Sequence, residues 1–305
     1  MPAVRVLTWN STGESPVKAQ HLTEVAELEN NDAAAKRQRN PGSEEDPPVS
    51  IVVIQEASRD GAIRAGLGDR AANQPFSDFA ERNGGAVVEE SREGGTGRQM
   101  RYLITWLERG NYALTAQGSA LTKIDLCTDI GVLAHLQRHI KNKDRRKDIE
   151  NKMAVWRMPA FRDLEIGGST VRFITWHAPT MNQKLPYPAG DFFDRWQFGV
   201  RDAFFLWGMS SWYTNNIKNL PPQDIAILAG DLNATSANLQ NVLDGWDGAS
   251  TKYDHILAYR NPRIVAGGPV SDDFSYDPNS PPETRKKDYG DHRIVVAKVN
   301  WKVGN

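Results

Sequence analysis

The sequence has one cysteine, almost no net charge and no long apolar segment. Cys127 has no second cysteine with which to pair, so an internal disulfide is excluded, and its apolar neighbours predict a buried, unreactive thiol. With 37 basic and 38 acidic residues, the net charge is −1. A polyanionic partner would therefore need a local basic patch or a bound metal ion, because no global field attracts it.

Signals for targeting and for membranes are lacking as well. No apolar run approaches the roughly 20 residues that cross a bilayer, and the first residues show no charged segment followed by an apolar one. We expect a cytoplasmic protein, or a secreted one whose signal segment has been removed. The 305 residues contain no convincing linker and no internal repeat, so we expect one domain over residues 1–305, as a monomer.

Several common site motifs do not occur. Residues 94–97, Gly-Gly-Thr-Gly, lack the preceding strand and the following lysine of a nucleotide-binding loop, and no serine-hydrolase elbow is present. His135 and His139 have i, i+4 spacing without an accompanying glutamate signature, which argues against a zinc site.

The chain does contain apolar, β-branched runs that alternate with helical patterns, which is typical of a layered α/β or α+β domain. We predict strands at residues 4–7, 50–54, 101–107, 130–136, 153–156, 170–176, 225–229 and 294–299. Helices are expected from Ser15-Pro16 to about residue 29 and within residues 192–212, and Gly167-Gly168 predicts a hairpin turn. Polar loops are expected at residues 30–48, 141–147 and 271–287.

The predicted strands end in residues that carry chemistry. Asn10, Glu56, His177 and the Asp231-Leu232-Asn233 segment each close a strand, and Asp291-His292 directly precedes the last one. In layered α/β proteins, sites form where strand ends meet, so we expect these side chains to converge. Carboxylate and amide oxygens suit a hard cation, Mg²⁺ or else Mn²⁺ or Ca²⁺.

A divalent ion together with two imidazoles is suited to hydrolysis of a phosphate ester. The ion neutralises phosphoryl charge, one histidine deprotonates water, and the other donates to the leaving oxygen or to the transition state. Each imidazole needs a partner on its second nitrogen, and Asp254 is a candidate for one of them.

Six motifs, taken in order, resemble those of the deoxyribonuclease I-like endonuclease/exonuclease/phosphatase superfamily. They are Thr8-Trp9-Asn10, Gln55-Glu56, Thr175-Trp176-His177-Ala178, Gly230-Asp231-Leu232-Asn233, Tyr253-Asp254 and Gly290-Asp291-His292. Within that superfamily, the sequences of these motifs are most similar to those of the catalytic (B) subunit of cytolethal distending toxins. The resemblance implies a four-layer α/β (α+β) sandwich, with two mixed β-sheets packed face to face and flanked by helices.

The resemblance also implies roles for individual residues. Glu56 would be the principal metal ligand, and the other ligands would be Asn10, Asp291 and Asp231. His292 would be the general base, paired with Asp254. His177 would donate to the phosphate or the leaving group. Asp231 and Asn233 would orient the metal, water and phosphate. The residues that contact the phosphate would be Arg157, Asn233 and Arg59. Arg157 is equally well explained as an ion-paired strand arginine.

The sequence departs from the family pattern at several positions. Gln99 and Met100 stand where deoxyribonuclease I has the glutamate that holds the histidine equivalent to His177, Ser58 replaces a basic residue, and Gly290 replaces a serine. The insertions at residues 30–48 and 136–152 look longer than those of the toxin subunits, and His255 has no explanation in the motif.

Three functions stay open at this point. The leading one is a metal-dependent phosphodiesterase that nicks DNA. The second is a phosphomonoesterase acting on inositol phospholipids or another phosphorylated small molecule. The third is an inactive, toxin-like binding subunit, and the resemblance also raises the possibility of toxin delivery subunits as partners.

Overall fold

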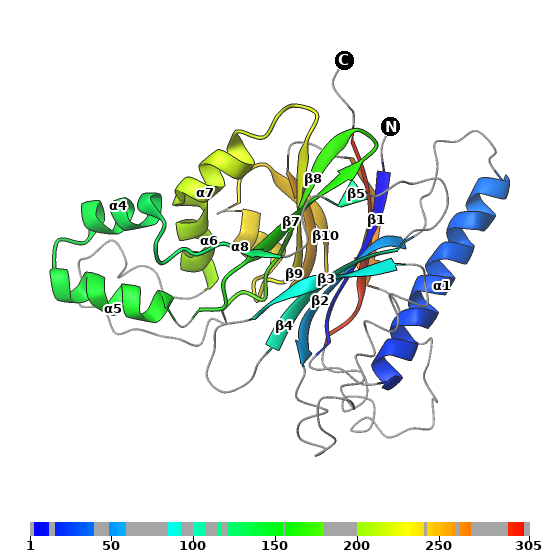
Figure 1. The fold of residues 1–305 in the computed structure, drawn as a ribbon, viewed down its shortest axis with the longest axis horizontal. Coiled ribbons are helices and arrows are strands. Elements are labelled where there is room, and N and C mark those ends of the chain that lie inside the picture. The colour runs from blue at the N-terminus through cyan, green and yellow to red at the C-terminus, as the bar shows by residue number, and fades with distance from the viewer. Residues whose placement is uncertain are drawn as a thin grey trace.

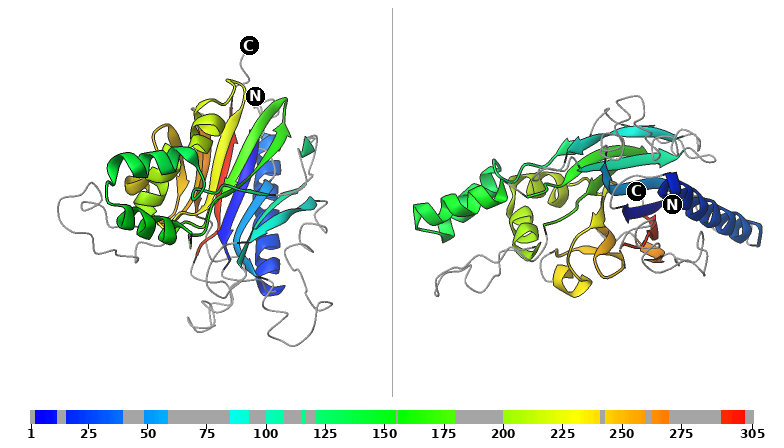
Figure 2. Two further views of the ribbon diagram at one scale, coloured as in Figure 1. Left: turned by 60° about the vertical axis from the view of Figure 1, so that its left-hand side comes forward. Right: turned by 90° about the horizontal axis from the view of Figure 1, so that it is seen from below.

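The computed structural model describes residues 3–11, 16–39, 49–58, 85–92, 100–107, 115–116, 121–154, 156–179, 200–240, 243–259, 263–269 and 292–301. Two mixed β-sheets pack face to face, with helix α1 (Pro16–Arg39) on one outer side and helices α4 to α7 on the other (Figures 1 and 2). The four-layer sandwich that the sequence predicts is therefore confirmed.

The first sheet has the strand order β12-β13-β1-β2-β4-β3. Its strands are β12 (Arg263–Pro269), β13 (Val295–Asn300), β1 (Ala3–Asn10), β2 (Val49–Ser58), β4 (Met100–Leu107) and β3 (Gly85–Arg92). Only β1 and β2 pair in parallel, and α1 connects them. A parallel pair requires such a crossover, because a short turn cannot return the chain to the same end.

The second sheet has the order β10-β11-β9-β8-β7-β5, and β6 also pairs with β7. Its strands are β10 (Trp246–Ser250), β11 (Asp254–Tyr259), β9 (Ile225–Asp231), β8 (Ser169–Thr175), β7 (Ala160–Ile166), β5 (Thr115–Ala116) and β6 (Thr122–Lys123). Here β8 and β9 form the parallel pair. Each sheet as described thus has one parallel pair near its centre, and the polar residues described below lie at the carboxyl ends of these pairs or on the neighbouring strands β11 and β13.

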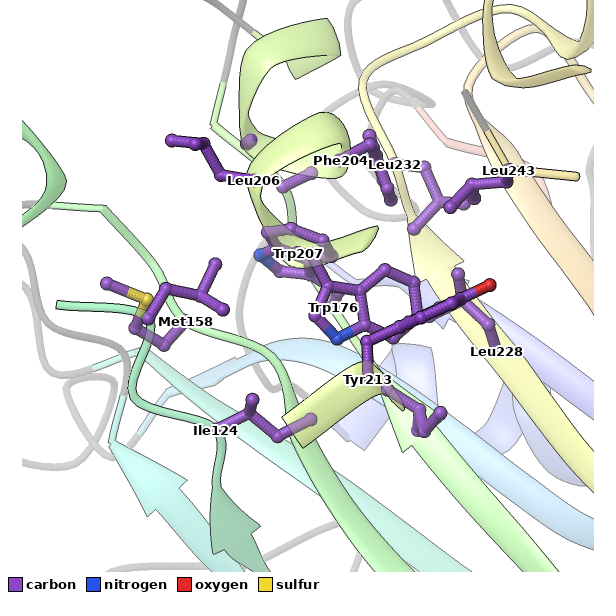
Figure 3. Packing of buried hydrophobic residues seen from close by; sticks show 14 of the residues in the cluster. Ile124, Met158, Trp176, Phe204, Leu206, Trp207, Tyr213, Leu228, Leu232 and Leu243 are labelled. Carbon is purple, nitrogen blue, oxygen red and sulfur yellow. The ribbon is translucent and has the colours of Figure 1, made fainter. Parts of the chain in front are cut away.

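Three apolar clusters hold the layers together. Val6, Val53, Phe173 and Ile227 belong to the core between the sheets and are fully buried. A second cluster joins α1 to the outer face of the first sheet. The third packs the outer face of the second sheet against the helices around Trp176, Phe204 and Trp207 (Figure 3). Each such side chain contributes about 1.5–3 kcal/mol by leaving water.

Residues 130–136 form part of helix α4 (Ile130–His139), so the strand predicted there is wrong. Asp129 is the N-cap, and its Oδ1 accepts the N–H groups of Gly131 and Val132 at 2.8 and 3.1 Å. The same carboxylate accepts the N–H groups at the start of α7 (Ser211–Tyr213). A short apolar run is compatible with either element, and this cap decides for a helix.

Two neighbouring predictions also need correction. The charged run at residues 141–147 is not a loop, because helix α5 (Lys143–Met153) begins within it at the N-cap Asn142. The strand predicted at residues 153–156 is wrong, since Met153 ends α5 and neither Ala154 nor Trp156 lies in a strand; the next described strand is β7. A charged, solvated helix face lacks the apolar period by which helices are recognised.

The helix α1 is longer than its apolar pattern indicates. It continues to Arg39 and therefore occupies part of the loop predicted at residues 30–48, of which residues 40–48 lie outside the described part. Lys36 and Asp32 form an i, i+4 ion pair on this polar stretch. The loop predicted at residues 271–287 also lies outside the described residues.

The hairpin prediction at Gly167-Gly168 is confirmed. Both glycines have positive φ, 58° and 81°, as a two-residue turn between antiparallel strands requires, and they connect β7 to β8. Of the helix expected within residues 192–212, α6 (Val200–Met209) and α7 are described, followed by a π-helical turn (Thr214–Lys218) and, after β9, α8 (Ser236–Gln240). Among the described helices, none has the length and apolar composition needed to cross a membrane.

Candidate active site

Five polar side chains meet where the two sheets come together at the ends of their parallel strands. Asn10 ends β1, Asp231 ends β9, Asp254 begins β11, and His177 and His292 lie just outside β8 and β13. They are far apart in the sequence, but β1 packs against β9 and β11. The structure thus brings together the described residues that the sequence singles out at strand ends.

Asp231 is at the centre of this group and is almost fully buried. Its Oδ2 accepts a hydrogen bond from Asn10 Nδ2 at 3.0 Å and lies 3.4 Å from His177 Nε2 and 3.7 Å from His292 Nε2. Its Oδ1 accepts the backbone N–H of Asn233 at 2.9 Å. A buried carboxylate requires such donors, because burial without them is costly.

His292 and Asp254 form a histidine–carboxylate pair. His292 Nδ1 lies 3.1 and 3.0 Å from the two oxygens of Asp254, so Nδ1 carries the proton and Nε2 faces Asp231. Asp254 is held in turn by Thr251, whose Oγ1 donates to Oδ2 at 3.2 Å. The indole of Trp9 donates to the backbone carbonyl of His292 at 3.1 Å and so fixes the start of the final strand segment.

His177 has a different kind of partner. Arg157 Nη1 lies 2.5 Å from His177 Nδ1, and Arg157 Nη2 donates to the carbonyl of Ala178 at 3.3 Å. The partner of the His177 Nδ1 atom is therefore a guanidinium. Arg157 is half-buried beside the imidazole and contacts it directly, whereas the sequence suggests a phosphate contact or a strand ion pair.

The end of β9 and the loop after it have a backbone conformation that few residue types adopt. Asn233 has a positive φ of 49°, a conformation that asparagine tolerates better than most side chains. Its Nδ2 donates to the carbonyl of Ala178 at 2.7 Å, which ties this loop to the His177 segment. Gly230 has φ 157°, and a Cβ there would meet the Trp176 carbonyl oxygen at 2.3 Å. Only glycine fits this close approach.

Gln55 joins the two sheets beneath the site, a role that the sequence analysis missed. It is fully buried, and its Nε2 donates to Thr8 Oγ1 at 3.2 Å and to Thr175 Oγ1 at 3.1 Å. These partners belong to β1 and β8, in different sheets. A glutamine directly after a continuously apolar strand is the signal that could have identified it.

His255 is explained by packing. It is fully buried, with Nε2 2.7 Å from the carbonyl of Ala234 and Nδ1 2.7 Å from Ser250 Oγ. Burial lowers the pKa of His255, although the Ala234 carbonyl and Asp231 oppose this effect. A neutral imidazole that donates from Nε2 and accepts at Nδ1 satisfies both partners.

Three predicted site residues are incompletely described. Asp291 and Arg59 lie outside the described residues, and for Glu56 only the backbone in β2 is described. Asn10 pairs in register with Gln55, so Glu56 is one residue further along, at the same end of the sheet as Asn10.

The described donors fit a hard divalent cation. Asp231, Asp254 and His292 each offer a ligand atom within 4.8 Å of the other two. Asp254 and His292 are already paired with each other, so the oxygens of Asp231 are better suited to an ion. Asn10 directs its Nδ2 to Asp231, and its amide oxygen is of the kind that hard cations prefer.

Comparison with solved structures shows the same fold. A truncated TDP2 from Caenorhabditis elegans has a TM-score of 0.50 at 12% identity, covering 98% of each chain. A second TDP2 structure from C. elegans has a TM-score of 0.50 at 11% identity, covering 98% of this chain and 75% of the other. No family model and no curated protein matches the sequence. By its fold, the chain is thus a deoxyribonuclease I-like sandwich.

Proposed function

We propose that this protein is a divalent-metal-dependent phosphoric ester hydrolase that cleaves phosphodiesters of DNA. The observation that carries the proposal is the His292–Asp254 pair, in which Nδ1 faces a carboxylate and Nε2 faces Asp231 Oδ2 at 3.7 Å. An imidazole held in this way has a basic nitrogen directed at the site, as a general base requires.

Each residue of the site has a separate role in the proposed reaction. His292 Nε2 accepts a proton from the attacking water, and Asp254 stabilises the imidazolium that results. Asp231 orients that water by accepting its second proton in a hydrogen bond. His177 Nε2, which also lies near Asp231 Oδ2, donates to the phosphate as negative charge develops.

A cation would be held by oxygens from Asp231 and Asn10, together with Glu56 and Asp291. When bound, a divalent ion neutralises phosphoryl charge and stabilises the leaving oxygen. Mg²⁺ is the expected ion, and Mn²⁺ or Ca²⁺ offer alternatives with the same ligand preference.

DNA is favoured as the substrate by the motif resemblance and by the charge around α5. Residues 138–152 contain seven lysines and arginines against three acidic residues, in a chain of nearly zero net charge. Arg138, Lys141, Lys143 and Lys147 are exposed, and Arg157 of the site follows the last residue of α5, Met153, by four positions in the sequence. Such a local patch can contact the phosphate backbone.

The test is nicking of supercoiled plasmid DNA by the purified chain in Mg²⁺, with EDTA as the control and a salt series. We expect nicked circles that EDTA abolishes and a rate that falls steeply with salt, because phosphate contacts release counterions.

Phosphate release from inositol phospholipid vesicles and from soluble phosphomonoesters should be measured in parallel. Release without nicking would replace DNA by a phosphomonoester as the substrate. Hydrolysis of neither, in Mg²⁺, Mn²⁺ or Ca²⁺, would contradict the proposal and favour an inactive binding subunit.

A further inference from the structure

The contact between Arg157 and His177 determines which nitrogen of that imidazole carries the proton. A guanidinium has only donors and stays charged at any pH at which a protein is folded. At 2.5 Å from Arg157 Nη1, His177 Nδ1 must therefore be the acceptor. The proton of the neutral ring then lies on Nε2, which faces Asp231 Oδ2 at 3.4 Å.

The other imidazole has the opposite arrangement. His292 Nδ1 faces the oxygens of Asp254, which can only accept, so its proton lies on Nδ1 and its Nε2 presents a lone pair. Both Nε2 atoms face the same oxygen, Asp231 Oδ2. One of them donates toward the site, and the other accepts from it.

We propose that Arg157 is a positioning residue that holds His177 as the Nε2–H tautomer and so makes it a neutral hydrogen-bond donor. This role rests on the proposed function, since donation to phosphate is what the tautomer serves. It differs from the phosphate contact that the motif implies for Arg157, because the guanidinium acts through the imidazole.

The surrounding contacts hold Arg157 for this role. The indole Nε1 of Trp176 donates to the backbone carbonyl of Arg157 at 2.7 Å, and Trp176 is fully buried in the aromatic cluster shown in Figure 3. Arg157 Nη2 donates to the backbone carbonyl of Ala178, the residue after His177. Residues 176, 177 and 178 thus each bond to Arg157, which fixes both the position and the rotation of the ring.

The direct test is the tautomer itself, read from long-range ¹H–¹⁵N NMR correlations of the imidazoles at about pH 8.5, roughly two units above the ordinary histidine pKa. The six histidines are few enough to assign, and a His177→Gln protein identifies the signal of His177. We expect protonated Nε2 for His177 and protonated Nδ1 for His292. Protonated Nδ1 at His177 in the unaltered protein would overturn the proposal, whether or not the protein hydrolyses phosphate esters.

A variant then tests the cause. Glutamine can both donate and accept, so Arg157→Gln releases the tautomer, and the His177 signal should lose its pure Nε2–H pattern. Arg157→Lys retains a donor and should keep that pattern. The matched control is Arg172→Gln, which removes another half-buried strand arginine, ion-paired to Asp163 at 2.6 Å, and should leave the His177 signal unchanged.

Kinetics distinguish positioning from phosphate binding. For Arg157→Gln we expect kcat to fall roughly 10- to 100-fold, as for loss of an outer partner of a site histidine, with KM nearly unchanged. A raised KM with unchanged kcat and an unchanged tautomer would contradict the proposal and assign Arg157 to phosphate. If the unaltered protein hydrolyses no ester, the proposed function is wrong. The NMR measurement would still test whether Arg157 sets the tautomer of His177.

Discussion

The chain contains two Asp-His dipeptides, Asp254-His255 and Asp291-His292, and their histidines have opposite surroundings. His255 is sealed in the interior with both nitrogens bonded, to Ala234 and Ser250. His292 has one nitrogen on a carboxylate and the other facing the site, and its side chain is 19% exposed. The histidine–carboxylate pair proposed for catalysis combines Asp254 of the first dipeptide with His292 of the second.

Strand alternation explains this exchange. Successive residues of β11 point to opposite sides, so when Asp254 faces the site, His255 must face away from it. Asp254 also pairs in register with Asp231, which places both carboxylates at the same end of adjacent strands. Identical dipeptides can therefore hold a proposed catalytic residue in one case and a buried structural one in the other, and local sequence does not distinguish them.

The largest expected effect comes from His292→Ala, which removes the proposed base. We expect kcat for plasmid nicking to fall about 10²- to 10⁴-fold, measured per folded molecule because the change also removes a donor from the buried carboxylate of Asp254. His135→Gln, at a histidine on α4 outside the basic segment 138–152, is the matched control and should keep full activity. An unchanged nicking rate in the His292 variant would show that the base is another group.

The second effect concerns stability, and it tests the other histidine. His255→Leu should lower the free energy of unfolding by about 2–4 kcal/mol, because the Ala234 carbonyl and the Ser250 hydroxyl lose their buried partner. Urea unfolding measures this change. The nicking rate per folded molecule should fall far less than in His292→Ala. A larger loss of activity than of stability would mean that His255 takes part in the chemistry.

Asp254→Asn should have an intermediate effect on rate. The amide cannot stabilise the imidazolium as the carboxylate does, so we expect kcat to fall roughly 10- to 100-fold. Combined with His292→Ala, it should cost little more than the His292 change alone, since both act through one pair. Fully multiplicative losses in the double variant would show that the two residues work independently.

The smallest effect is expected at His135 on α4, a histidine remote from the sheet edge. Burial, followed by the charges of His139 and Arg138, lowers the pKa of His135. A histidine with a lowered folded pKa contributes stability that is complete above about pH 6.5 and is lost as the pH falls through the folded pKa.

His135→Gln should therefore flatten the dependence of unfolding free energy on pH between about pH 7 and 5, by less than about 1 kcal/mol because solvent screens the site. Denaturant melts at a series of pH values measure the difference. A steeper dependence in the variant would have the wrong sign for this explanation.

The sequence predicted the fold most reliably where the pattern was continuous. The apolar runs predicted as strands at residues 50–54 and 225–229 lie within β2 and β9, and those at 170–176 and 294–299 match β8 and β13 except for one end residue each. It failed at residues 130–136 and 141–147, where a short apolar run and a charged run turned out to be helical. The N-capping residues Asp129 and Asn142 indicate the starts of these helices. The prediction followed the apolar and charged runs after them instead.

The site was predicted in part. The strand-end residues Asn10, His177, Asp231 and His292 do come together, and Asp254 lies against His292 as expected. The partner of His177 was not foreseen, because nothing in the sequence places residue 157 beside residue 177. Their roles in catalysis remain predictions that the variants above test.

The sequence by itself determined which segments become buried strands and which polar residues end them, because hydrophobic period and strand length are local properties. Only the tertiary structure decided that His255 packs into the interior, that Gln55 joins the sheets, and that a guanidinium holds His177. These depend on strand register and on the packing of two sheets, which relate residues far apart in the chain, and such relations have no local signature.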